Sequence, residues 1–231
     1  VQIRSRDRFK STVYKNVRTL TLLAAGATVA LGLASQTGTT AVPLPALNQR
    51  IMEFCQKSMG RKVGDGECAD LAYKAMLASG AESPDYYKDD PKPGDYVWGD
   101  LVYGRKIQGR DQLEKGERLD VKPGDIIQMR DLIIEHEEVT DEYVSREVID
   151  ADHHTAIVSG LSDDGLTYDV IEQNANEVPT VTTGKLRIGE MKRGYILVYR
   201  AVPGLSGDRN VDGQARYRAG AQTREWKKAR R

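Results

Sequence analysis

Two segments in the first third of the chain carry apolar residues at the spacing of an α-helix. The apolar stripe of the first, over residues 49–59, consists of Ile51, Phe54, Cys55 and Met59. Asn48 is placed to cap this helix. The second helix, over residues 68–79, begins with Cys68, directly after a loop at 61–67 that contains two glycines.

From residue 95 onward, short β-branched or aromatic runs bounded by Gly, Pro, Asp or Asn predict strands instead. The runs cover residues 95–102, 125–129, 155–159, 167–171, 181–183 and 195–199. The sequence SDDG at 162–165 predicts a hairpin turn between two of them. Helices followed by antiparallel strands are typical of an α+β fold. We expect one domain over residues 48–203, with N-terminal helices packed on a small antiparallel β-sheet.

The charge of the chain is unevenly placed, although its formal net charge is zero and its 39% hydrophobic content excludes a disordered protein. Residues 1–34 and 207–231 each carry a net charge of +5, so the body between them carries −10. Within the body, apolar residues are scattered through the acidic segment 131–152. We interpret this segment as an inserted flap or helical excursion, and residues 204–231 as a disordered basic tail.

The first 34 residues are predicted to be a targeting signal. A basic stretch precedes the apolar run at 20–34 (LTLLAAGATVALGLA). As a helix this run spans about 22 Å, less than the roughly 30 Å of a hydrocarbon core, which favours a signal peptide over a membrane anchor, the alternative. We therefore expect an exported protein (periplasmic, cell-surface or extracellular) with a linker at 35–47. We expect a monomer without a nucleic-acid partner, whose membrane contact is limited to the N-terminal segment.

Cys68 is the first candidate for chemistry, because it lies at the start of a predicted helix. The unpaired N–H groups and the dipole of a helix N-terminus stabilise a thiolate, and the same N–H groups can hold an oxyanion. The alternative for a single cysteine is a small buried hydrophobic residue. Cys55 fits that alternative, because it lies within the apolar stripe of the first helix.

Two adjacent histidines, His153 and His154, begin the strand that continues to residue 159. Strand alternation sends their side chains to opposite faces, so one of them is placed to reach the Cys68 helix. The chain has three histidines and two cysteines without CxxC or HExxH spacing. We therefore expect no metal site.

Glu172 and Asn174 end the next predicted strand and lie two residues apart, on one face of it. If this strand pairs with 155–159 through the predicted hairpin, both side chains lie near His154. A side-chain oxygen at that place fixes the imidazole tautomer that accepts a thiol proton.

This ordered set of motifs resembles the CHAP and NlpC-type amidase and peptidase domains over residues 48–200. It also resembles the cysteine-proteinase-fold domain at the C-terminus of certain fungal actin-patch proteins. The matching pieces are Gly66-Glu67-Cys68, Pro123-Gly124-Asp125, His154-Thr155-Ala156-Ile157-Val158 and Glu172-Gln173-Asn174.

The resemblance implies a papain-like fold that hydrolyses amide bonds, commonly in peptides or peptidoglycan, without a cofactor. Carried over by position, Cys68 is the nucleophile, His154 the general base, and Glu172 and Asn174 the orienting and polar-support groups. Two alternatives stay open. One is a catalytically silent binding module with the same fold, and the other is an exported structural domain with a Cys55–Cys68 disulfide.

Overall fold

The computed structural model describes residues 9–17, 43–86, 96–141 and 143–204. Two helices, α1 (Ala46–Ser58) and α2 (Cys68–Ser79), precede most of the strands. The strands are β1 (Phe9–Val17), β2 (Asp85–Tyr86), β3 (Tyr96–Val97), β4 (Asp100–Gln108), β5 (Asp111–Gly116), β6 (Ile126–Val139), β7 (Tyr143–Leu161), β8 (Tyr168–Glu172), β9 (Thr182–Leu186) and β10 (Met191–Arg200).

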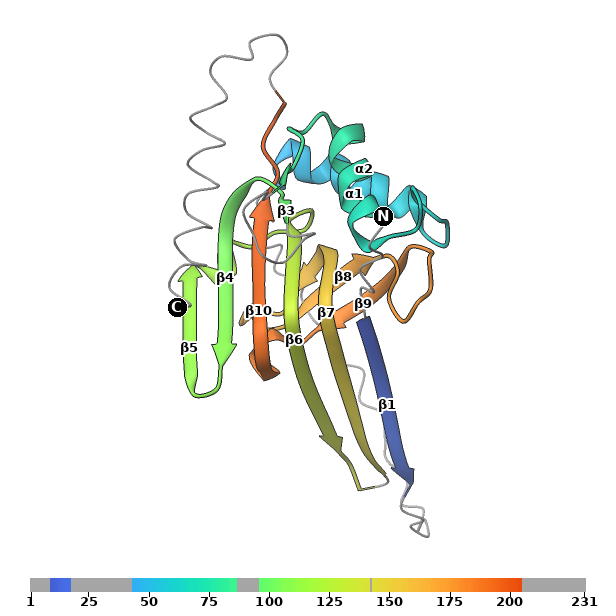
Figure 1. The fold of residues 1–231 in the computed structure, drawn as a ribbon, viewed down its shortest axis with the longest axis vertical. Helices are drawn as coiled ribbons and strands as arrows, with labels where there is room; N and C mark the ends of the chain where they lie inside the picture. The colour runs from blue at the N-terminus through green and yellow to red at the C-terminus, as the bar shows by residue number, and fades with distance from the viewer. Residues whose placement is uncertain (1–8, 18–42, 87–95, 142, 205–231) are drawn as a thin grey trace, which may run out of the picture.

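The main sheet has eight antiparallel strands in the order β5-β4-β10-β6-β7-β8-β9, with β1 added beside β7. The short strands β2 and β3 pair separately. Both helices lie together at one end of the sheet (Figure 1). The α+β fold is confirmed, but the sheet is larger than the small sheet expected from the sequence.

Hydrophobic residues form a core on each face of the sheet. Ile126 and Ile127 are adjacent in β6 and belong to different clusters, as strand alternation requires. The cluster of Ile126 includes Ile51, Leu71, Met76 and Trp98, which join both helices to the sheet. The predicted hairpin turn after β7 is confirmed, because Gly165 N–H donates to the Ser162 carbonyl at 2.9 Å.

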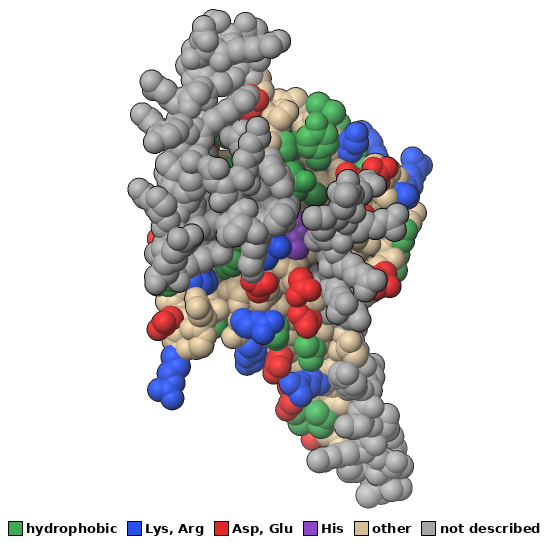
Figure 2. Space-filling model, viewed as in Figure 1, with side chains coloured by type: hydrophobic (Ala, Val, Ile, Leu, Met, Phe, Trp, Pro, Cys, Tyr) green, Lys and Arg blue, Asp and Glu red, His purple; other side chains and the backbone are tan. Residues whose placement is uncertain are grey.

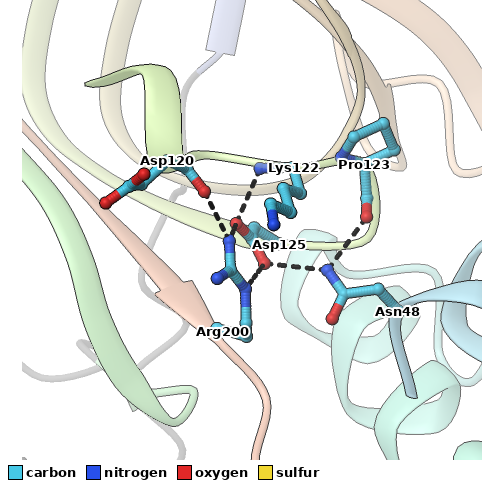
Figure 3. A network of polar contacts seen from close by, with 6 residues as sticks. All are labelled: Asn48, Asp120, Lys122, Pro123, Asp125 and Arg200. Carbon is cyan, nitrogen blue, oxygen red and sulfur yellow. Dashed lines mark hydrogen bonds and ion pairs between the residues drawn. The ribbon is translucent and has the colours of Figure 1, made fainter. Parts of the chain in front are cut away.

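Helix α1 begins at Ala46, inside the segment predicted to be a linker, and Asn48 does not cap it. The Asn48 side chain is buried and donates hydrogen bonds to the Pro123 carbonyl at 2.9 Å and to Asp125 Oδ1 at 2.8 Å (Figure 3). The position is therefore polar because it attaches α1 to the turn before β6.

The same buried Asp125 carboxylate receives the guanidinium of Arg200 from the end of β10. Arg200 Nε donates to Asp125 Oδ1 at 2.9 Å and Nη2 donates to Oδ2 at 2.7 Å (Figure 3). The hydrogen bond to Asp125 raises the pKa of Arg200 against the opposing effect of burial. Asp125 of the Pro-Gly-Asp turn therefore joins α1, β6 and β10.

The acidic segment 131–152 is neither a flap nor a helix. It forms the outer halves of β6 and β7, which pair with each other from Leu132↔Ala151 to Val139↔Val144. We call this segment, residues 131–152, the hairpin arm. It protrudes beyond the rest of the sheet (Figure 1), and acidic side chains lie along it (Figure 2). Its pairing satisfies the backbone, so charged side chains are tolerated on a half-exposed ribbon.

Strand β1 was not predicted, because residues 9–17 fall within the expected targeting signal. It runs antiparallel to β7 along the hairpin arm. The apolar run 20–34 and residues 205–231 of the predicted tail lie outside the described residues. Among the residues that are described, no helix is long and apolar enough to cross a membrane. Export and membrane contact stay predictions.

Candidate active site

Cys68 is the first residue of α2, as predicted, and a tight loop brings the chain to it. The carboxylate of Asp70 accepts hydrogen bonds from the backbone N–H of Asp65 at 2.7 Å and of Glu67 at 3.3 Å. A Cβ on Gly64, whose φ is +59°, would lie 2.8 Å from the carboxyl carbon of Asp70. Glycine is therefore required where this loop folds back over the start of the helix.

His154 lies in β7 with its imidazole buried against the carboxylate of Glu172 in β8. Its Nε2 lies 2.9 Å from Glu172 Oε2, and the side chains are 1% and 5% exposed. The strand register places Glu172 opposite Ala156, which shares a face with His154. The predicted pairing of this histidine with Glu172 is confirmed.

The protonation of His154 depends on both of its neighbours. Burial opposes the charged form of the imidazole, but hydrogen bonds to the side chains of Cys68 and Glu172, and electrostatic attraction to both, raise the pKa of His154 to about 10. Cys68 and Glu172 therefore both favour the charged form of the imidazole.

The Glu172 carboxylate also decides which ring nitrogen faces the thiol. A carboxylate accepts a hydrogen bond, so Nε2 of His154 carries a proton and donates a hydrogen bond to Glu172. The remaining ring nitrogen, Nδ1, is the one left for Cys68. Nδ1 is therefore the nitrogen that can hold a proton from the thiol and later give it up.

Gln173, which belongs to the Glu172-Gln173-Asn174 motif but had no predicted role, holds the loop before Cys68. Its side chain is fully buried and accepts from Val63 N–H at 2.7 Å through Oε1. Its Nε2 donates to the carbonyls of Val63 at 3.0 Å and of Glu67 at 2.9 Å. Glu67 directly precedes Cys68, so Gln173 anchors both ends of the loop that leads to Cys68.

Asn174 does not share the face of Glu172. Strand β8 ends at Glu172, and Asn174 has a left-handed backbone with a φ of 63°. Its Nδ2 donates to the carboxylate of Glu67 at 3.2 Å. The expectation that Asn174 lies beside His154 is therefore wrong, and its contact is with the residue before Cys68.

His153 points away from the Cys68 site, as strand alternation requires, and contacts Gln128. Trp98 Nε1–H can only donate, and it lies 3.1 Å from Gln128 Oε1. The amide nitrogen of Gln128 therefore faces the Nε2 of His153 at 2.8 Å and the carbonyl of His154 at 3.2 Å. Thr155 Oγ1 donates to the same Oε1 at 3.2 Å. Gln128 thus holds the backbone of the histidine pair.

Cys55 and Cys68 are both free thiols, so the predicted alternative of a disulfide between them is wrong. Cys55 is fully buried in the apolar stripe of α1, and burial raises its pKa to about 12. It has the inert character of a core cysteine. Among the described residues, no group of three or more His, Cys, Asp or Glu side chains is placed to hold a metal ion.

The family of AIM3/BBC1 cysteine proteinase-fold domains matches residues 46–208. The chain belongs to this family. The match begins where α1 begins and extends past β10, so it covers the helices, the candidate site and most of the sheet. It confirms the resemblance to the cysteine-proteinase-fold domain of actin-patch proteins, while the resemblance to CHAP and NlpC-type enzymes stays a prediction. No curated protein and no solved structure matches the chain significantly.

Proposed function

We propose that this domain is a cysteine hydrolase that cleaves amide bonds in peptide substrates, with Cys68 as its nucleophile. The observation that carries the proposal is the relay of Cys68, His154 and Glu172, in which the Glu172 carboxylate lies 2.9 Å from His154 Nε2 and interaction with Cys68 raises the pKa of the same imidazole. Each member has the residue type and the order that thiol catalysis needs: a nucleophile at a helix start, a base and a group that orients the base.

The reaction divides into two half-reactions. The proton shared by Cys68 and His154 resides on the imidazole, and the Cys68 sulfur attacks the carbonyl carbon of the amide. The C–N bond then breaks, and the leaving amine takes the proton from the imidazole. In the second half, His154 accepts a proton from water as the water oxygen attacks the thioester; the C–S bond breaks, the carboxylic acid leaves, and the Cys68 sulfur again lies beside the protonated imidazole.

Backbone geometry supports the tetrahedral intermediate. Cys68 occupies the first position of α2, where helix N–H groups have no intrahelical partner. Its own N–H is therefore placed to stabilise the developing oxyanion. The anchoring of Glu67 by Gln173 holds the peptide group that carries this N–H.

The second candidate is a binding module that keeps the fold without turnover. The burial of the site favours it, because Cys68 and His154 are 2% and 1% exposed. The family match also agrees with a binding module, because it identifies the fold and not an activity. Nothing in the match supports peptidoglycan as the substrate, so peptidoglycan stays a prediction.

The two candidates are separated by incubating the full chain with a pool of peptides and identifying products by mass spectrometry. The hydrolase cleaves peptides, Cys68→Ala abolishes the cleavage, and Cys55→Ala, the matched control, preserves it. A binding module retains peptides on the immobilised chain, intact, and retains them equally after Cys68→Ala. Full cleavage by the Cys68→Ala variant contradicts the hydrolase.

A further inference from the structure

Strand β7 has different neighbours along its two halves. Residues 156–161 pair with β8, whereas residues 143–151, which belong to the hairpin arm, pair with β1. Strand β6 pairs with the opposite edge of β7 over residues 144–157. In the half of β7 that belongs to the arm, the outer backbone N–H and C=O groups therefore pair with β1. Without β1, this half of β7 would be an open sheet edge.

Strand β1 stands apart from the domain on which it lies. Nine residue pairs, from Phe9↔Ala151 to Val17↔Tyr143, join it to β7. Figure 1 shows β1 along the protruding arm, away from both helices. The family match begins only at residue 46, so β1 is an addition to the family domain. Its sequence is also separated from α1 by residues 18–45.

The charges of the two partners are complementary. Residues 1–18 carry a net charge of +5, and the hairpin arm carries −8. Two arm carboxylates are held by arginines, Glu135 by Arg146 at 3.0 Å and Glu147 by Arg187 at 2.6 Å. The exposed acidic residues of the arm that form no ion pair with any other side chain described are Glu137, Glu138, Asp141, Asp150 and Asp152.

We propose that the outer edge of the hairpin arm, residues 143–151 of β7, is a docking site for basic, extended peptide segments of partner proteins. Such a segment adds a strand to the arm through main-chain hydrogen bonds, and the arm carboxylates select for Lys and Arg. Strand β1 occupies this site within the chain, so a partner must displace it. An intramolecular strand competes at an effective concentration of about millimolar, which sets the barrier to partner binding.

The test uses the full chain and a fluorescein-labelled peptide with the sequence of residues 4–18. The variant Thr12→Pro/Val13→Pro is designed to weaken the pairing of β1 with β7. Alternate N–H groups of β1 face β7, so one of two neighbouring prolines removes an N–H that bonds to β7. Fluorescence anisotropy is expected to show at least tenfold tighter peptide binding to this variant than to the unaltered chain. A second variant, Lys10→Glu/Lys15→Glu, weakens β1 without proline and is expected to act in the same direction.

The arm is tested by Glu137→Lys/Glu138→Lys, introduced into either β1 variant. We expect peptide binding to weaken at least tenfold, and to weaken further as NaCl is raised. The matched control, Glu53→Lys/Glu117→Lys, makes the same charge change at exposed positions outside the arm and is expected to leave binding within twofold. Equal binding to the unaltered chain and both β1 variants, or equal loss in the arm and control variants, would overturn the proposal.

Discussion

Nε2 of Gln173 donates a hydrogen bond of 2.9 Å to the carbonyl oxygen of Glu67, the residue directly before Cys68. Its neighbour Glu172 holds His154 at 2.9 Å. Two adjacent residues at the end of β8 therefore act on opposite sides of the strand. Glu172 orients His154 and Gln173 fixes the loop before Cys68, so the end of β8 organises the whole candidate site.

Replacing Gln173 by Leu tests the role of this loop anchor. The change leaves Val63 N–H and the carbonyls of Val63 and Glu67 without their partner, and we expect it to lower the free energy of unfolding by about 2 kcal/mol. Urea denaturation measures the loss. Gln49→Leu, which removes one exposed hydrogen bond, is the control and is expected to change stability by less than about 0.5 kcal/mol.

The charge on His154 should persist well above neutral pH. Because hydrogen bonds to Cys68 and Glu172 raise its pKa to about 10, the imidazole is expected to be protonated at pH 8. Cys68→Ala or Glu172→Gln removes one source of this stabilisation while burial still opposes the charge, so each variant should lower the pKa. A ¹H–¹⁵N NMR titration of the imidazole signals measures it, with His136→Gln as an assignment control. An unchanged pKa in both variants would contradict the relay.

Gln128 should stabilise the histidine pair through its amide. Gln128→Met keeps the length of the side chain but leaves the Trp98 indole N–H and the His154 carbonyl without this partner. We expect a loss of about 2 kcal/mol in the free energy of unfolding, together with a shift of the His154 imidazole resonances. Gln112→Met, at an exposed position of β5, should change neither. A loss of stability without any shift at His154 would limit Gln128 to packing.

The Asp125–Arg200 pair should contribute more to stability than an exposed ion pair. Asp125 is fully buried, so Arg200→Met leaves its charge without its main partner and is expected to cost about 3 kcal/mol. Lys57→Met breaks the exposed pair with Glu53 and should cost less than about 1 kcal/mol. Urea unfolding of the two variants compares them, and equal losses would refute the structural role of Asp125.

The relation of His154 to Glu172 could be predicted because it depends on two local rules. Strand alternation and a short hairpin turn fix which side chains of neighbouring strands share a face. Asn174 escaped the same rule because its backbone turns to a positive φ, which ends the alternation. Gln173 was part of a recognised motif, but its partners lie 106 and 110 residues away and follow from tertiary packing alone.

The hairpin arm and β1 show where pattern reasoning fails at larger scale. Scattered apolar residues among acidic ones do not predict strands, yet β6 and β7 stabilise each other by pairing over the length of the arm. Residues 9–17 have a basic composition that is also typical of a targeting signal. Their strand depends on an edge at residues 143–151, far along the chain, which no local pattern contains.

The central claim is that Cys68 is a nucleophile, and the chain provides its own control in Cys55. Both thiols are buried, but Cys68 lies at a helix start and raises the pKa of His154, whereas burial raises the pKa of Cys55 to about 12. Peptide mapping of the native chain after timed exposure to iodoacetamide at pH 7 measures both rates. The account predicts that Cys68 is alkylated at least a hundredfold faster and that Glu172→Gln slows it. Equal, slow alkylation of the two cysteines would contradict it.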